Sequence, residues 1–283
     1  MLAPTGRNSG AAQLTLRLLR LNESTRAQAL RQLATGRRIN RGADDPAGIV
    51  ASARLSASFA ALEAESRSNA RAQAVVATAD AALGEASALL GEARRLVLAN
   101  ADSTLSPEER AANQAQIDAI AAGIDRIGNT AQFNGVKLFD GNLSVSVTGA
   151  SVSVDRLSSA SLGATEVDGQ AETLASLRAG GRLASGSGRD SAAAEVVDRA
   201  IGDIATARAR LGAFARNTLE TRAGVLGVAV ENLSAARAAV QDADFARVTA
   251  EAFRGELLAA ASTFSLARSF RARRQAFAAL FAA

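Results

Sequence analysis

The chain has no cysteine and no histidine among its 283 residues. These absences exclude disulfide bridges, thiol nucleophiles and zinc sites built from cysteine and histidine. They also exclude the two-histidine metalloprotease motif and the serine–histidine–aspartate triad. Carboxylates alone can still hold a metal, but the sequence shows no suitable cluster of Asp and Glu. We therefore expect no enzymatic activity, no cofactor and no bound metal.

Aromatic residues and lysine are also scarce. There are ten Phe, no Trp and no Tyr, and Lys137 is the single lysine. Alanine dominates the 48% of residues that are apolar. It favours helix but buries little surface, so long alanine-rich faces need packing partners. The formal net charge of +4 can favour nucleic acid or anionic lipid. Because acids and arginines are interspersed along most of the chain, we expect no nucleic-acid partner.

No stretch of the sequence predicts a signal peptide or a membrane span. The first segment carries arginines and lacks an apolar core of about 7–15 residues before a small-residue cleavage site. The longest runs without charge, 141–154 and 257–267, are too short to cross a bilayer as a helix. We expect no membrane insertion, and export without a cleaved signal peptide.

Two helices are predicted in the first hundred residues. Spaced leucines indicate an amphipathic helix over 9–35, with a frayed segment before it. After a break at 36–46, apolar residues recur to about residue 100, which predicts a helix of about 80 Å. A compact protein of this length has a radius of gyration of only about 19 Å, so we expect an elongated molecule. Polar residues at central heptad positions argue against a strong leucine zipper: Ser66, Asn69, Gln73 and Asp80.

A third helix and a hairpin follow. Ser106 can cap the helix, Pro107 suits its first turn, and Glu109 completes a capping box. We expect this helix to run antiparallel to the long one and to end near Gly128–Asn129. Asn134–Gly135 between apolar residues is a strong hairpin signal.

The remainder predicts strands, an insert and two more helices. Alternating valines over 143–154 indicate strands, and the Ser/Gly/Ala-rich residues 156–189 predict an irregular, exposed insert. Helix returns over 190–240, capped by Asp190 or Ser191, and a last helix covers 244–281. We expect the two end helices to pair, and the inner helices likewise. The predicted fold class is mainly α: an elongated antiparallel bundle or coiled coil of long helices with a small β-hairpin region and a short central insert.

The break before the long helix is rich in charge. Pro46 suits the first helical position, and either Asp44 or Asp45 can cap the helix. The segment is either a plain polar loop or a joint that holds two parts at a fixed angle. Its charged residues are Arg37, Arg38, Arg41, Asp44 and Asp45.

Short motifs recur in an ordered series over residues 8–147 and 190–283. They are Leu33–Asn40, Asp44–Gly48, Ser68–Ala70, Ala99–Thr104 and Gln132–Leu138, then Leu211–Phe214, Glu231–Ala236 and Asp242–Asp244. Each is weak alone, but in this order and spacing they resemble bacterial flagellin. The resemblance implies a structural subunit that polymerises into the bacterial flagellar filament and serves swimming motility.

The resemblance also implies a domain layout. Residues 1–43 plus 242–283 would form an inner tube, and residues 44–148 plus 190–241 an outer helical tube that includes the hairpin. Residues 149–189 would be a short, variable, surface-exposed insert.

Partners, location and monomer state follow from the same resemblance. The implied partners are further copies of the chain, an export chaperone at the C-terminal helix, the filament cap and the hook–filament junction proteins. Family members leave through the flagellar type III export channel, so the expected location is the extracellular filament. We also expect residues 1–35 and 244–283 to be disordered in the monomer and to fold on assembly.

The candidate site residues serve assembly or the joint. The C-terminal arginines replace the neutral amides common in the family, and they form either a solvated face or contacts that line a lumen or pair neighbouring subunits. At the positions of Glu92 and Ala99 the chain lacks the arginine and glutamine of flagellins recognised by the animal innate receptor, so we expect weak recognition. The candidates are Arg37, Arg38, Asn40, Arg41, Asp44, Asp45, Phe133, Asn134, Gly135, Asn232, Arg268, Phe270, Arg271, Arg274 and Phe277.

Two other interpretations use the same residues. A hook–filament junction protein shares the end helices, although the hairpin and Glu231–Ala236 favour flagellin. A basic helical protein could instead bind nucleic acid or membrane surfaces through Arg268–Arg274, and a steep salt dependence of DNA binding would mark it.

Overall fold

The computed structural model describes residues 5–147 and 149–281. Contacts divide the chain into two compact units. The terminal unit is Met1–Ala61 with Val230–Ala283, and the core unit is Leu62–Ala229. Helix α2 (Pro46–Asn100) and helix α5 (Thr221–Gln241) each contribute to both units. The predicted inner-tube and outer-tube boundaries concern the filament and stay predictions.

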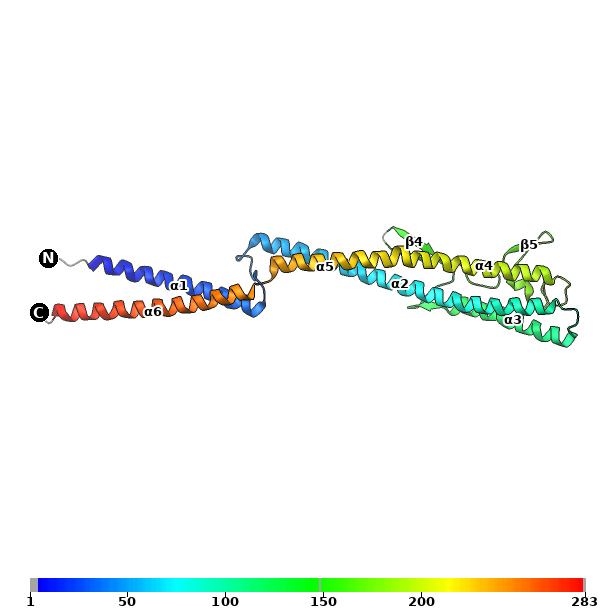
Figure 1. The fold of residues 1–283 in the computed structure, drawn as a ribbon. Helices are drawn as coiled ribbons and strands as arrows, with labels where there is room; N and C mark the ends of the chain where they lie inside the picture. The colour runs from blue at the N-terminus through cyan, green and yellow to red at the C-terminus, as the bar shows by residue number, and fades with distance from the viewer. Residues whose placement is uncertain (1–4, 148, 282–283) are drawn as a thin grey trace. The chain divides into compact units, whose positions relative to one another are not determined.

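The terminal unit pairs the two ends of the chain. Helix α1 (Thr5–Thr35) and helix α6 (Phe245–Phe281) pack side by side (Figure 1), which confirms the predicted pairing. They approach closely at Gly255, where an added Cβ would lie 3.2 Å from the Cβ of Arg26. The predicted start of α1 at residue 9 was four residues late, because the glycine at position 6 costs only about 1 kcal/mol in a helix.

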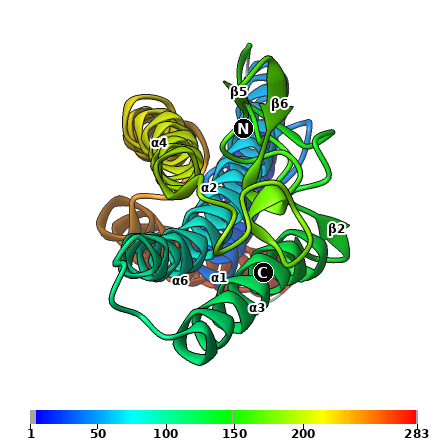
Figure 2. The ribbon, with the colours of Figure 1, turned by 90° about the vertical axis from the view of Figure 1, so that its right-hand side faces the viewer.

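The core unit is built on α2, α3 (Pro107–Thr130) and α4 (Asp190–Phe214). Figure 2 shows α3 and α4 on different sides of α2. Three ion pairs show that α4 and α5 run antiparallel to α2. As the residue number of the partner on α2 rises, the residue number of its partner on α5 or α4 falls. The mainly α fold class and the pairing of the inner helices are therefore confirmed. The pairs are Glu65–Arg222, Asp80–Arg208 and Arg94–Asp198.

The buried face of α2 repeats every seven residues. Of the four predicted polar heptad positions, Asn69 is buried, Gln73 and Asp80 are half-buried, and Ser66 is exposed, so only Asn69 lies fully in the seam. The buried seam of α2 uses two heptad positions. One of them is occupied by alanine, so a heptad pattern based on large apolar residues does not reveal it. The two seam positions hold Val76, Leu83, Leu90 and Val97, and Ala72, Ala79, Ala86 and Ala93.

Helix α3 begins as predicted, with a capping box. The Ser106 hydroxyl accepts a hydrogen bond from the Glu109 N–H at 3.2 Å, and the Glu109 carboxylate accepts one from the Ser106 N–H at 2.8 Å. The hydrogen bonds from Ser106 hold the pKa of Glu109 below its ordinary value, because they favour the charged form. The helix ends at Thr130, close to the predicted end.

The predicted helix over 190–240 is continuous but not uniform. A π turn, η2 (Ala215–Glu220), separates α4 from α5. Arg189 occupies the N-cap position of α4 without a side-chain cap bond. The predicted cap by Asp190 or Ser191 was therefore wrong.

The strands form two-stranded antiparallel pairs. The hairpin turns at Asn134 and Gly135, whose φ angles of 49° and 81° suit a type I′ turn. The second pair is also where the alternation predicted it. The pairs are β1 (Gln132–Phe133) with β2 (Val136–Lys137), β3 (Ser144–Val147) with β4 (Ala150–Ser153), and β5 (Thr165–Val167) with β6 (Gln170–Glu172).

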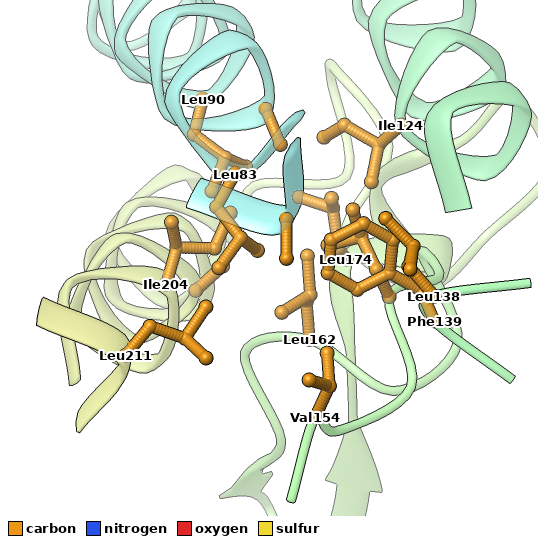
Figure 3. Packing of buried hydrophobic residues seen from close by; sticks show 14 of the residues in the cluster. Leu83, Leu90, Ile124, Leu138, Phe139, Val154, Leu162, Leu174, Ile204 and Leu211 are labelled. Carbon is orange, nitrogen blue, oxygen red and sulfur yellow. The ribbon is translucent and has the colours of Figure 1, made fainter. Parts of the chain in front are cut away.

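The segment predicted to be an exposed insert is instead partly buried. Its 3-10 turn η1 (Leu174–Leu177) packs beside α3 and α4. On α3, Asp125 accepts hydrogen bonds from the Ser159 N–H at 2.6 Å and hydroxyl at 3.0 Å, and it pairs with Arg178. The Ser/Gly-rich composition hid leucines that complete the hydrophobic core with α2, α3 and α4 (Figure 3): Leu157, Leu162, Leu174, Leu177 and Leu183.

Two long helical segments, α2 and residues 190–241, are apolar enough to cross a membrane by length and composition alone. Alanine is responsible for much of this apolarity. Buried residues of α2 and α4 belong to one hydrophobic core, and two ion pairs join these helices.

Candidate assembly site

The two breaks between helices are joined by backbone hydrogen bonds. The Arg38 N–H donates to the Gln241 carbonyl at 2.8 Å, and the Ala243 N–H donates to the Gly36 carbonyl at 2.9 Å. Arg37 and Asp242 form an antiparallel bridge between these bonds. We call residues 36–45 together with 240–243 the joint. The sequence predicted a break at each place but not that the two breaks pair.

The Arg38 side chain ties the joint together. Its guanidinium donates to the Val240 carbonyl at 2.8 Å and lies 3.4 Å from a carboxylate oxygen of Asp45. The Arg38 carbonyl accepts from the Gln32 side-chain amide at 2.7 Å, and Gln32 is buried. Because the ionic side chains are 39% and 32% exposed, the ion pair alone contributes only about 0–1 kcal/mol. The bond to the distant carbonyl is what links the two breaks.

Asp44 and Asp45 have different tasks. Asp44 accepts from the N–H groups of Asn40 at 3.1 Å and Arg41 at 2.9 Å, which closes the loop. Asp45 accepts from the Gly48 N–H at 2.8 Å, so it is the residue that caps α2. The sequence left both aspartates open as the cap, and the structure selects Asp45.

Gly48 packs closely against Ile39 and Asp45 at the joint. Ile39 is buried. A Cβ added to Gly48 would lie 2.4 Å from both the Asp45 carboxylate and the Ile39 Cδ1 atom. A larger residue at position 48 would therefore displace either the cap or the apolar anchor. Ile39 and Gly48 belong to the motifs Leu33–Asn40 and Asp44–Gly48, but the motifs do not indicate the contact between these two residues.

Replacing Asp45 by alanine is expected to destabilise the first turn of α2 by about 1 kcal/mol, because the cap is lost. Asp45→Asn should cost less, since asparagine caps helices well and only the exposed ion pair disappears. Hydrogen exchange of the amides at 47–50 measures the difference. Equal exchange in the two variants would show that the cap contributes nothing.

Other predicted joint residues lie at the surface. The side chains of Arg37 and Arg41 are exposed. Asn40 is half-buried, and its amide donates to the Arg37 carbonyl at 2.9 Å. The structure therefore brings all six predicted joint residues together, with Arg37 and Arg41 pointing their charges at solvent.

The hairpin candidates and Asn232 lie outside the joint. Asn134 and Gly135 form an exposed tip in the core unit, and Phe133 is half-buried. The hairpin is anchored by the buried pair that follows it, Leu138 and Phe139. Asn232 is exposed on α5.

The C-terminal candidates lie on α6. Arg268, Phe270, Arg271 and Arg274 are exposed. Arg268 and Arg271 line a shallow depression beside Phe264. The side chain of the remaining candidate, Phe277, lies outside the described residues.

Helices α1 and α6 leave large apolar side chains in water although they pack on each other. In the described part of the core unit, the large exposed apolar residues are fewer: Leu98, Val136, Val225 and Val228. Many large apolar side chains exposed on one helix pair indicate a surface for protein association. We call it the terminal apolar surface, and its members are Leu14, Leu16, Leu18, Leu21 and Leu30 on α1 and Phe245, Phe253, Leu257, Leu258, Phe264 and Phe270 on α6.

The described ranges contain no candidate metal site. No group of three or more acids is placed there to hold a metal ion. A depression between α4 and residues 155–162 contains charged side chains that already pair with each other. These pairs are Arg199–Asp203 at 3.7 Å and Arg210–Asp155 at 3.3 Å.

Comparison with known proteins finds flagellar filament proteins among the relatives. The family described as bacterial flagellin N-terminal helical region matches residues 8–144. A flagellin of Bacillus subtilis (strain 168) is 31% identical, and the alignment covers 92% of this chain and 94% of the relative. A flagellar filament 31.3 kDa core protein of Treponema maltophilum is 27% identical over 92% of this chain and 93% of the relative.

A solved structure shows a similar fold. It is a putative flagellar hook-associated protein from Vibrio parahaemolyticus, with a TM-score of 0.59 and 15% identity. The match covers 70% of this chain and 99% of that one. At this identity the likeness concerns the fold alone.

Proposed function

The chain belongs to the bacterial flagellin family, and from this membership we infer how its described surfaces build a polymer. The protein is a structural subunit of the bacterial flagellar filament, which serves motility. It associates with further copies of itself, and the filament lies outside the cell.

The terminal apolar surface supports the assembly mechanism. Leu257 and Phe264 are 72% and 71% exposed, and burial of such side chains contributes about 1.5–3 kcal/mol each. The chain cannot bury them within its own α1–α6 pair, so copies of the chain must cover them. Contacts between different surfaces of successive copies produce an open helical polymer when the rotation between copies does not close into a ring.

We assign the two predicted tubes accordingly. Residues 1–43 and 242–283 form the inner tube around the terminal apolar surface, and residues 44–148 and 190–241 form the outer tube. Residues 149–189 face the outside, with their leucines anchored in the core.

The joint connects these layers. Its hydrogen bonds hold the two crossing chain segments together. Its exposed charges, Arg37 and Arg41, pair with neighbouring copies. Arg268, Arg271 and Arg274 face the lumen or acids of adjacent copies.

The remaining partners are also proposals. An export chaperone covers α6 before assembly, because that helix presents exposed apolar residues. The filament cap guides insertion, and junction proteins connect the filament to the hook. Export uses the flagellar type III channel without a cleaved signal peptide, and the protein performs no catalysis.

The proposal is tested by comparing purified monomer with polymer. Electron microscopy should show micrometre filaments, whereas a hook–filament junction protein would not form them. Hydrogen exchange in α1 and α6 should be fast in the monomer and slow in the polymer, because assembly covers their apolar faces. Seam amides of α2, around Leu83 and Leu90, are the internal control and should be protected in both states. Full protection of α1 and α6 in the monomer would contradict folding on assembly.

A further inference from the structure

The packing seams of the core unit are nearly self-repeating. On α2 the same two positions carry valine or leucine and alanine in successive heptads. On α4 the buried residues Val197, Ile204 and Leu211 are also seven residues apart, and Ile204 lies beside Leu83 (Figure 3). Sliding one helix by a heptad, about 10 Å, would place similar side chains opposite each other. Apolar packing therefore defines the alignment poorly.

Two features interrupt this repetition. On α2 the seam position seven residues before Val76 holds Asn69, which is 2% exposed. On the helix that faces α2, the buried series Val197, Ile204 and Leu211 continues with Leu219. This step spans eight residues instead of seven. The π turn at 215–220 lies within this step and accommodates the extra residue, because it widens the helix by one residue per turn.

The two irregular features contact each other. The Asn69 side-chain N–H donates to the Leu219 carbonyl at 2.9 Å. The Asn69 Oδ1 atom is buried and finds no donor among the described residues. After a shift of one heptad the amide would face Leu211 or Leu226, which lie in regular α-helix where carbonyls accept from the helix's own N–H groups. That position is unfavourable for a buried polar group.

A second polar contact lies about one turn away. Arg222 pairs with Glu65, and these side chains are only 26% and 33% exposed. Residues 65 and 69 are one turn apart on α2, as residues 219 and 222 are on the opposite helix. Two of the polar contacts between the helices thus lie at the π turn, and the ion pairs Asp80–Arg208 and Arg94–Asp198 lie further along α4.

We propose that Asn69 and the π turn at 215–220 form a register lock that specifies a single alignment of α2 against α4 and α5. A buried asparagine at a seam position is a known way to select register at a cost in stability. Here its acceptor, the Leu219 carbonyl, belongs to the π turn, so the two features act as one device. In a polymer every copy must present the same surface, and an alignment error of one heptad would displace that surface in each copy.

A double-mutant cycle on the monomer tests the coupling and does not depend on filament formation. Deleting Asn217, an exposed residue of the π turn, restores seven-residue spacing and allows an ordinary α-helix. Asn69 then loses its acceptor. Asn69→Val should therefore be more favourable in the deletion background than in the native chain, by on the order of tenfold in the unfolding equilibrium constant. An identical effect in both backgrounds would refute the coupling.

The distance between a label on α2 and a label on α4 tests the register directly. This measurement is sufficient to test the proposal if the deletion variant does not fold. Because the chain has no cysteine, nitroxide labels can be placed on cysteines at the exposed residues Ala74 and Ala209. Pulsed electron spin resonance should give one narrow distance in the native chain and a broadened or second distance in Asn69→Val. Val76→Ala is the control, since it weakens the same seam without touching the lock and should keep one distance. A single unchanged distance in Asn69→Val would overturn the proposal.

Discussion

Replacing Gly128 by alanine is expected to destabilise the core unit by about 3 kcal/mol, at the upper end of overpacking effects. Gly128 lies on α3, and an added Cβ would sit 1.9 Å from the Leu157 carbonyl oxygen. That oxygen belongs to the backbone and has no rotamer that relieves the clash. The segment carrying Leu157 must move, and the hydrogen bonds between Ser159 and Asp125 move with it.

Gly202→Ala is the matched control for this prediction. Gly202 is an exposed helical glycine of the same unit, and a Cβ added there would meet no neighbouring group of the described residues within 4 Å. Alanine there should stabilise α4 by about 0.5–1 kcal/mol, since it favours helix. Hydrogen exchange of seam amides in α2 reports both changes. Equal stability of the two variants would mean that residues 155–162 can move away from α3 without an energetic cost.

Replacing Phe264 by aspartate is expected to raise the critical concentration for polymerisation at least thirtyfold. The side chain is 71% exposed on α6, so its loss costs the monomer little. Its burial between copies contributes about 2 kcal/mol, which corresponds to roughly thirtyfold. A carboxylate buried without a partner would increase the effect further.

Ser265→Asp places the same charge on the neighbouring exposed residue. It removes no apolar surface, so polymerisation should change far less. Phe264→Leu should retain most of the assembly. Sedimentation of polymer from monomer measures all three variants. If Phe264→Asp polymerises as readily as Ser265→Asp, the apolar face of α6 does not drive assembly.

Much of the local structure was predictable because its causes are local. The capping box at Ser106 and Glu109 needs only residues three apart, and the hairpin turn at Asn134–Gly135 needs only residues that tolerate positive φ. The pairing of the two ends followed from their matching order along the chain. The insert was misjudged, because a leucine such as Leu174 is buried by helices distant in sequence.

At the joint, too, the sequence predicted the residues but not their distant partners. Its charged residues were found from composition and spacing. Their partners were not, because the Val240 carbonyl meets Arg38 across some 200 residues of chain. A backbone carbonyl carries no sequence signal, so no pattern could have assigned it. Motif order likewise identified the family, whereas only the structure shows which leucines and phenylalanines of α1 and α6 stay exposed after the two helices pair.

The sequence by itself determined the order of the helices, the hairpin, the capping box of α3 and the absence of cysteine and histidine chemistry. Periodicity, turn residues and composition act over a few residues, which is why they can be read directly. Only the tertiary structure decided which seam frame of α2 is buried, which aspartate caps it, how the two breaks pair and where Asn69 finds its acceptor. Each of these depends on which distant group occupies the remaining space, and that is settled by packing and by the need to satisfy buried polar atoms.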